Sequence, residues 1–188
     1  MKFPDLFPTI ETPRLLLRQL SLDDAEPQFE IMKDSAVTRY WGSGTWSELQ
    51  QSIESIENTI KYFESGDSFK WAIVRKEDGV FLGTASLWNF KFAHRYAEIG
   101  YLIGREFWGN GYAPEAMLEV LRFGFETLDL NRIEADTDPR NQNSIRVLQK
   151  LGMIQEGLLR QRWIVEGEIS DTALFAILKQ DWNPNRGT

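Results

Sequence analysis

The sequence contains no cysteine and a single histidine, His94. The lack of cysteine excludes disulfide bonds, thiolate nucleophiles and cysteine-ligated metal sites. One histidine cannot build a histidine-rich metal cluster and supplies at most one member of a catalytic relay. No apolar run approaches the roughly 20 residues that span a bilayer, and residues 1–9 lack the apolar segment of a signal peptide. We therefore expect a cytoplasmic protein with no metal centre and no membrane partner.

A strong charge of one sign is also missing. The 188 residues carry 21 basic and 28 acidic side chains, a net charge of −7. Residues 1–100 hold 11 basic and 15 acidic side chains, and the remainder holds 10 and 13, so neither half has a basic block. Duplex-binding proteins show a concentrated positive surface. We expect no nucleic-acid partner, and the mildly anionic balance favours cationic partners such as amines.

The chain length is typical of one domain with its own core. Apolar residues alternate between helical and strand spacing, which predicts an α/β domain. The expected strands are 15–20, 69–74, 80–87, 96–103, 132–137, 153–164 and 171–178. The expected helices span 22–32, 114–128 and 144–151, and a further helix ends at Phe63. Ser21 is the expected cap of the first helix. Ser47, with Gln50 at the capping-box position, is the expected cap of the helix that ends at Phe63. Hairpin signals stand at 76–79 and 166–167.

The most informative local segment is 108–115, Trp-Gly-Asn-Gly-Tyr-Ala-Pro-Glu, between an expected strand and an expected helix. Gly109 and Gly111 permit a tight turn and close approach of a ligand to the backbone. Pro114 suits the first helical turn, and the free N–H groups of a helix start bind anions such as phosphate. The same pattern occurs in ordinary turns, so local physics leaves both interpretations open.

Two well-known phosphate loops do not match this segment. The Walker loop requires Gly-Lys-Ser/Thr, and the segment has no lysine. The dinucleotide fingerprint requires a third small residue where Pro114 stands. A nucleotide-binding domain that uses the same glycines stays as an alternative.

Further motifs extend this segment along the chain. They are Glu-Ile-Gly-Tyr-Leu-Ile at 98–103, Arg-Ile-Glu-Ala at 132–135, Asn-Gln-Asn-Ser at 141–144, Leu-Gly-Met at 151–153 and Glu-Gly at 156–157 with Arg160. Their order and spacing closely resemble the GNAT superfamily of N-acetyltransferases, and Thr-Pro-Arg-Leu-Leu-Leu-Arg at 12–18 is similar to the start of its RimJ/RimL-type branch. The resemblance implies one N-acetyltransferase domain over residues 10–182. It implies the α/β GNAT fold, with a mixed, mostly antiparallel central sheet flanked by helices.

The resemblance also implies acetyl-CoA as the acetyl donor. In similar proteins the pyrophosphate of coenzyme A lies on backbone N–H groups of the glycine loop, which here are those of Gly109, Asn110, Gly111, Tyr112 and Ala113. Trp108 replaces the usual Gln or Arg. The pantetheine arm pairs with the end of the preceding strand, which here is Tyr101, Leu102 and Ile103. Asn141 resembles the asparagine that contacts the cofactor. Gly100 suits a β-bulge that opens the sheet, with close packing as the alternative.

Glu98 is the candidate base. Acetylation of an amine needs a proton acceptor, a polarised thioester carbonyl and a proton for the departing thiolate. Glu98 lies on the strand face opposite the apolar stripe, and similar acyltransferases often use a strand glutamate there, commonly through water. The alternative is a solvated or ion-paired strand glutamate.

The usual acid of the superfamily is absent. Many members have a tyrosine seven residues after the Asn of the Asn-x-x-Ser/Ala motif, and that position here is Leu148. Ser144 is the candidate hydrogen-bond donor to the sulfur, with capping of its helix as the alternative. Direct release of a thiolate stays open, since a thiol has a pKa of about 8.5. The missing tyrosine makes a non-catalytic acyl-CoA-binding module the alternative function.

The resemblance implies direct transfer in a ternary complex to a primary amine. The acceptor is either a small molecule or a protein N-terminus, such as that of a ribosomal protein. Aromatic side chains that could line the acceptor pocket are Tyr40, Trp41, Trp46 and Trp88, with core packing as the alternative. The sequence leaves open whether the chain forms a homodimer.

Overall fold

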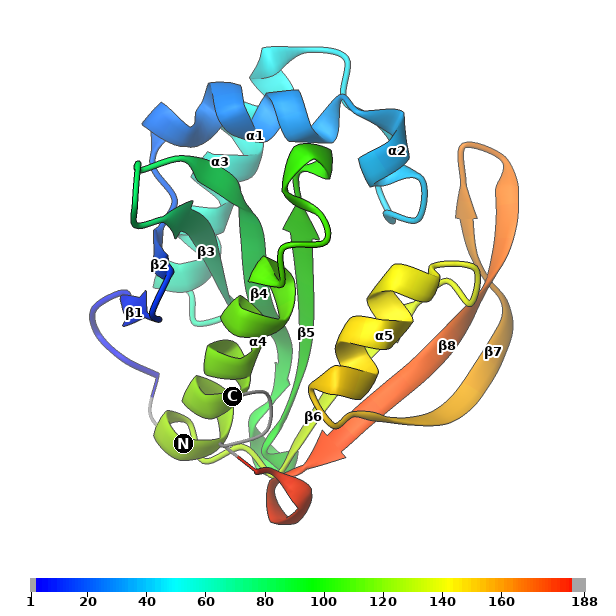
Figure 1. The fold of residues 1–188 in the computed structure, drawn as a ribbon. Helices are drawn as coiled ribbons and strands as arrows, with labels where there is room; N and C mark the ends of the chain where they lie inside the picture. Colours follow the sequence, from blue (N-terminus) through cyan, green and yellow to red (C-terminus); the bar gives the residue numbers. More distant parts are fainter. Residues whose placement is uncertain (1–2, 184–188) are drawn as a thin grey trace.

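The computed structural model describes residues 3–183, which build an eight-stranded sheet with helices on both faces (Figure 1). The strands are β1 (Ile10–Glu11), β2 (Leu15–Gln19), β3 (Ser68–Arg75), β4 (Phe81–Lys91), β5 (Tyr96–Ile103), β6 (Arg132–Thr137), β7 (Ile154–Val165) and β8 (Glu168–Leu178). The helices are α1 (Ala25–Met32), α2 (Ser35–Thr38), α3 (Leu49–Glu64), α4 (Tyr112–Arg122) and α5 (Gln142–Lys150). Short helical turns are η1 (Leu22–Asp24), η2 (Phe92–His94), η3 (Arg105–Phe107), the π-helical η4 (Phe123–Thr127) and η5 (Lys179–Asp181).

The strand order is β1-β2-β3-β4-β5-β6-β8-β7, and every neighbouring pair is antiparallel except β5 and β6. This confirms the mixed, mostly antiparallel sheet expected from the sequence. The turn between β7 and β8 is also confirmed, because Glu166 (φ 49°) and Gly167 (φ 84°) are both left-handed. Two such residues form the turn whose twist matches a β-hairpin.

Each face of the sheet carries its own core, because successive strand residues point to opposite sides. On the face covered by α4 and α5, buried residues such as Trp71, Ile99 and Met117 pack together. On the face covered by α1 and α3, Leu102 and Ala72 pack with Ile56 of α3. The side chain of Glu98 therefore belongs to the α3 face, and Gly100 lies on the same face, as the alternation along β5 predicts.

The sheet divides between β5 and β6. These strands are parallel and pair only through three residues of each, from Tyr96 opposite Arg132 to Glu98 opposite Glu134. The last five residues of β5, 99–103, have no partner on that side, and the two halves of the sheet diverge as a V (Figure 1). The free edge of β5 is the feature that positions the site.

Several boundaries differ from the sequence-based expectation. The strand β1 and the helix α2 span two and four residues, too few to show a periodic pattern. Glu48, with Gln51, caps α3 in place of Ser47 and Gln50. Helix α4 begins at Tyr112, two residues early, and α5 begins at Gln142 because Asn141 caps it.

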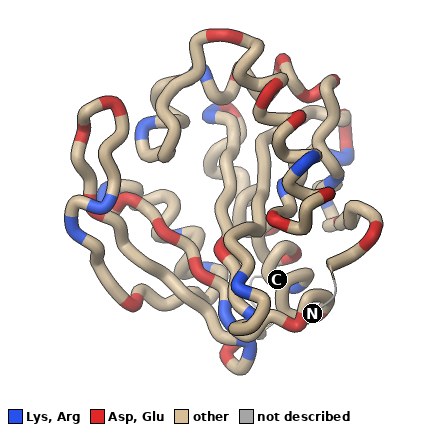
Figure 2. Tube along the Cα trace, turned by 180° about the vertical axis from the view of Figure 1, so that it is seen from behind, with Lys and Arg blue, Asp and Glu red and all other residues tan. Residues whose placement is uncertain are grey.

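Charges of both signs are spread along the described chain (Figure 2). Among residues 3–183, no helix is long and apolar enough to cross a membrane.

Candidate active site

The glycine loop before α4 has the conformation that its residues predict. Gly109 and Gly111 have φ values of +78° and +77°, in the left-handed region that glycine adopts without strain. Gly111 is the N-cap of α4, and no side chain caps the helix. A side chain at Gly109 would meet nothing within 4 Å, so the loop surface is open.

The backbone N–H groups of this loop are available. Within residues 3–183, no acceptor binds the N–H of Gly109, Asn110 or Gly111. The carbonyl of Asn110 instead accepts from Arg14 Nη1 at 3.0 Å, and the Asn110 side chain donates to the carbonyls of Phe107 and Trp108 at 3.1 Å. Free N–H groups at the start of a helix form an anion site.

Arg14 and Glu115 hold the loop in place. The Arg14 Nε donates to Glu115 Oε2 at 2.6 Å, and the guanidinium lies 4.7 Å from the centre of the Tyr112 ring. Thr12 donates to the same carboxylate at 2.5 Å. Burial alone raises the pKa of Glu115, but the hydrogen bonds from Thr12 and Arg14 outweigh it and lower the pKa below its ordinary value. Arg14, which lies between β1 and β2, thus connects the start of the chain to the glycine loop.

Trp108 connects the loop to the free strand edge. Its indole N–H donates to the carbonyl of Ile103 at 2.7 Å, and its ring is 43% exposed. The loop and the unpaired end of β5 therefore form one continuous surface, which includes the expected residues Tyr101, Leu102 and Ile103. The N–H groups of the loop lie at one end of this surface and Glu98 lies near the other.

Glu98 is held by neutral donors rather than by a cation. Its Oε1 accepts from Asn89 Nδ2 at 2.6 Å and lies 2.7 Å from the Tyr96 hydroxyl, which is also 3.0 Å from Glu134 Oε2. Because a phenol has one proton, Tyr96 donates to one of these two carboxylates at a time, and Glu98 is the nearer. No hydrogen bond or ion pair within residues 3–183 reaches its Oε2, and the side chain is half-buried. Burial and the Glu98 carboxylate raise the pKa of Tyr96 well above 10, so that the phenol keeps its proton. One oxygen of Glu98 is therefore fixed by hydrogen bonds, and the other has no partner within the described chain.

Gly100 does not form the expected bulge. It pairs in regular register with Ser86, and the irregularity of β4 lies between Trp88 and Lys91 instead. A Cβ on Gly100 would stand 2.8 Å from Cη2 of Trp88. The alternative of close packing is therefore correct, and glycine is needed because an indole covers this position.

At the start of α5 the helix cap is Asn141 and not Ser144, contrary to the capping alternative. Asn141 is the N-cap, since its Oδ1 accepts from the N–H of Ser144 at 3.1 Å. Capping by Ser144 is wrong. Its Oγ accepts from the Tyr101 hydroxyl at 3.3 Å, across the opening between β5 and α5. Burial raises the pKa of Tyr101 to about 12, so this phenol also stays protonated. Leu148 is 2% exposed and belongs to the core.

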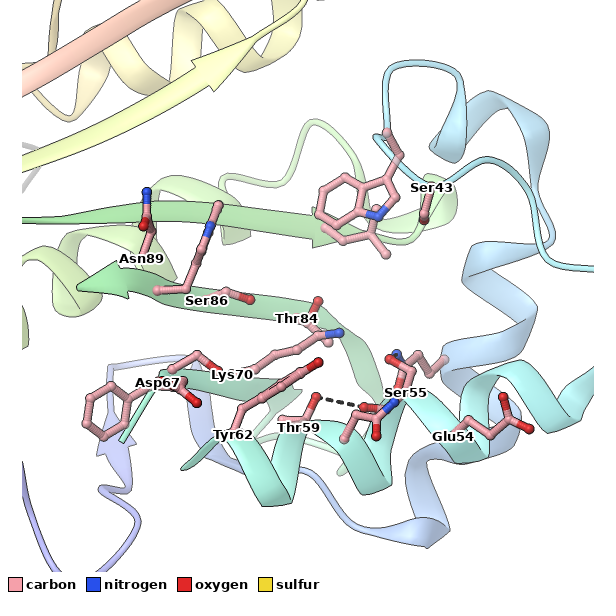
Figure 3. A pocket seen from close by; sticks show the side chains of 18 of the residues that line it. Ser43, Glu54, Ser55, Thr59, Tyr62, Asp67, Lys70, Thr84, Ser86 and Asn89 are labelled. Carbon is pink, nitrogen blue, oxygen red and sulfur yellow. Dashed lines mark hydrogen bonds between the residues drawn. The ribbon is translucent and has the colours of Figure 1, made fainter. Parts of the chain in front are cut away.

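A pocket of about 990 Å³ lies on the other face of the sheet, under α3 (Figure 3). Its floor is built from residues that are paired across β3, β4 and β5: Thr84 with Leu102, Lys70 with Ser86 and Gly100, and Ser68 with Trp88. Glu98 stands at the edge of this floor, and its partner Asn89 lines the pocket. Of the expected aromatic residues, Trp41, Trp46 and Trp88 line it and Tyr40 does not.

Sequence reasoning missed Arg14, Tyr96, Asn89 and Lys70. Asn89 has a positive φ of 52° at a strand irregularity. Asparagine adopts this conformation more readily than most residues, so its residue type is the local signal that the sequence offered. Arg14 acts through contacts with residues about a hundred positions away, Glu115 and Asn110, whereas Tyr96 contacts Glu98 within the same strand. His94 lies in an exposed turn.

Comparison with known proteins agrees with this geometry. Residues 14–154 match the family model described as an acetyltransferase (GNAT) domain. The chain is 37% identical over 174 residues to the uncharacterized N-acetyltransferase YoaA of Bacillus subtilis (strain 168), which covers 93% of this chain and 98% of that protein. It is 28% identical over 127 residues to the [Ribosomal protein uS5]-alanine N-acetyltransferase of Escherichia coli (strain K12), with 67% and 66% covered.

A solved structure supplies a third comparison. Mycobacterium smegmatis RimJ in complex with CoA-disulfide superposes with a TM-score of 0.81 at 26% identity, covering 88% of this chain and 82% of that one. The family model spans most of the chain, and YoaA matches it nearly end to end. The chain therefore belongs to the GNAT acetyltransferase family and is an N-acetyltransferase.

Proposed function

We propose that this chain transfers an acetyl group from acetyl-CoA to a primary amine by direct attack in a ternary complex, in the cytoplasm, through one domain over residues 10–182. GNAT acetyltransferases use acetyl-CoA, and a similar structure was solved with a form of coenzyme A.

The observation that carries the proposal is the opening between β5 and β6. Donor-binding features lie along it: the loop N–H groups at 109–111 and the unpaired edge of β5. Glu98 borders the same opening at the last paired row, and its neighbours Trp88 and Asn89 line the pocket under α3. A donor on one face and an acceptor on the other could meet there.

The residues present fit coenzyme A. A diphosphate suits the free N–H groups of Gly109, Asn110 and Gly111 and the start of α4. The open space at Gly109 leaves room for the phosphate oxygens. The edge of β5 from Tyr101 to Ile103 offers backbone groups to the amides of the pantetheine arm. When bound, the cosubstrate supplies an activated acyl thioester.

Glu98 removes the proton from the amine, directly or through a water. Asn89 and Tyr96 keep its Oε1 in place, and Oε2 accepts the proton. A free backbone N–H of the β5 edge polarises the thioester carbonyl. Much of the rate comes from holding the amine against the carbonyl carbon.

Ser144 donates a hydrogen bond to the departing sulfur. Because Ser144 Oγ accepts the hydrogen bond from the Tyr101 phenol, the serine keeps its own proton available for donation to the sulfur. Asn141 orients the first turn of α5 and contacts the cofactor from there.

Thiol release with a panel of primary amines tests the proposal. Saturable release that depends on both substrates is the expected result. Tight binding of acetyl-CoA without turnover on any amine would instead indicate an acyl-CoA-binding module. Competition by ATP or NAD in a thermal-shift series would indicate a nucleotide site.

A further inference from the structure

Lys70 is an unexpected feature of the acceptor pocket. It lies in β3 within the run Phe-Lys-Trp-Ala, on the α3 face of the sheet. Its neighbours across the sheet are Ser86 of β4 and then Gly100 of β5. Gly100 lies on the unpaired edge of β5, so Lys70 is in register with the opening of the sheet. Figure 3 shows its side chain running over the floor toward Thr84.

The described part of the chain provides no anion for this lysine. No hydrogen bond or ion pair within residues 3–183 involves Lys70 Nζ, although the side chain is half-buried. Burial lowers its pKa to about 8, because the cation loses hydration without gaining a partner. An anionic ligand at Nζ would reverse that loss.

The other charged groups of the pocket do not neutralise Lys70. Asp67 accepts from Ser65 at 2.5 Å, and Glu54 accepts from Gln50 at 3.2 Å; both carboxylates are exposed at the rim. Lys91 of β4 is exposed at the rim as well. The floor around Lys70 is otherwise built from neutral residues such as Ser68, Thr84 and Trp88.

Gln28 is a second unsatisfied group in the same pocket. It is 2% exposed, and its Oε1 has no hydrogen-bond partner within the described chain. Its Nε2 is used, because it donates to Ser55 Oγ at 3.4 Å. A buried acceptor without a donor costs about 1–3 kcal/mol, so such an atom points to a ligand N–H.

We propose that Lys70 and Gln28 form a subsite for a carboxylate and its neighbouring amide in the acceptor, which is a peptide amine carrying a carboxylate two or three residues from its N-terminus. This inference rests on the proposed function. The Lys70 and Gly100 positions are two strand spacings apart, about 10 Å. An extended tripeptide spans about that length. The carboxylate is either the free C-terminus of a short peptide or an acidic side chain near the N-terminus of a longer one.

Matched peptides test the subsite. The probes are Ala-Ala-Ala with a free carboxylate, the same tripeptide amide, and longer amidated peptides that begin Ala-Ala-Asp or Ala-Ala-Asn. The wild type is expected to prefer the carboxylate member of at least one pair by tenfold or more in kcat/KM. The tripeptide pair reports a C-terminal source, and the Asp/Asn pair reports a side-chain source. A ratio near 1 for both pairs would refute the subsite.

Substitutions test whether Lys70 causes the preference for the carboxylate peptide. Lys70→Met is expected to raise KM for the preferred peptide tenfold, to abolish the preference and to leave kcat and coenzyme A affinity unchanged, whereas Lys70→Arg keeps the preference. Lys91→Met, at the rim of the same pocket, is the matched control and should behave as wild type. A preference that survives in Lys70→Met would overturn the assignment.

Calorimetric binding of the same peptides to the coenzyme A-saturated protein separates the two proposals. Lys70-dependent binding of the carboxylate peptide without acetylation would leave the subsite standing and remove the proposed function. Acetylation of all four peptides at equal rates would refute the subsite and leave the proposed function standing.

Discussion

Replacement of Glu98 by glutamine is the most direct test of the mechanism. The substitution keeps the size and planarity of the side chain, and its Oε1 can still accept from Asn89 and Tyr96. What it removes is the second carboxylate oxygen, Oε2, as a proton acceptor. The fold and the cofactor surface on the loop at 108–113 are therefore expected to persist.

The expected size of the effect follows from the two roles of the carboxylate. A general base contributes about 10²–10⁴-fold to rate, so kcat should fall at least about 100-fold, or ~2.7 kcal/mol of transition-state stabilisation. Changing a charged acceptor into a neutral one weakens its hydrogen bonds by about 1 kcal/mol. In a domain of this size that corresponds to a decrease in Tm of about 2–4 °C.

The assay is thiol release at saturating amine, from pH 6 to 9, with coenzyme A affinity measured by calorimetry. Glu57→Gln, on the exposed side of α3, is the matched control and should be silent. The reasoning fails if Glu98→Gln retains more than one third of the wild-type kcat across this range. It also fails if coenzyme A affinity drops in parallel, since the loss would then be structural.

Three further substitutions test other parts of the structure. Gly109→Ala places a Cβ in open space but at a φ of +78°, so backbone strain of about 1–2 kcal/mol should raise KM for acetyl-CoA several-fold at constant kcat; unchanged affinity by calorimetry would argue against the loop as the diphosphate site. Asp24→Asn should cost about 3–5 kcal/mol at pH 7, because Asp24 is 3% exposed and accepts from Arg18 at 2.7 Å twice. Burial alone raises the pKa of Asp24, but the hydrogen bonds from Arg18 and Ser21 lower it below 3.8, so this stability is present above pH 3.8 and disappears as pH falls through the folded value. Urea unfolding at pH 7 and pH 3 should show the difference between variant and wild type shrinking; an equal loss at both would contradict the assignment. Leu148→Tyr should lower Tm by overpacking a buried site, at a cost of about 1–3 kcal/mol, without raising kcat; a faster enzyme would mean that the tyrosine acid position is accessible after all.

The glycine loop could be predicted from the sequence because its determinants are local. Gly109 and Gly111 adopt positive φ, and Pro114 lies in the first turn of α4. The alternation along β5 likewise predicts that Glu98 faces away from the apolar stripe, and the structure agrees. Each of these features depends on residues within a few positions of one another.

The opening of the sheet could not be predicted in this way. It arises because β5 pairs with β6 over only three residues, and those strands are separated by α4 and η4. The hydrogen bond from Asn89 to Glu98 depends on the irregularity in β4, which lies on a different strand from Glu98. Lys70 stands among buried residues such as Phe69 and Trp71, a composition typical of core strand. The packing of β3, β4 and β5 in the folded chain shows that it lines the pocket under α3.

A continuous sheet would separate the two substrates that this reaction must bring together. The cofactor surface runs along the loop of α4 and the edge of β5, whereas the pocket lies under α3 on the opposite face. A hydrogen-bonded neighbour on β5 would block both its backbone groups and passage between the faces. The pairing of β5 with β6 ends at Glu98 and Glu134, so the proposed base, Glu98, stands at the first point where an amine from the α3 side could reach a thioester on the other side. Glu134 stands in the same row but accepts from Arg132 Nε at 2.6 Å, whereas Glu98 is held by the neutral donors Asn89 and Tyr96. Its position together with the lack of an ion pair within residues 3–183 therefore distinguishes Glu98 from its neighbour.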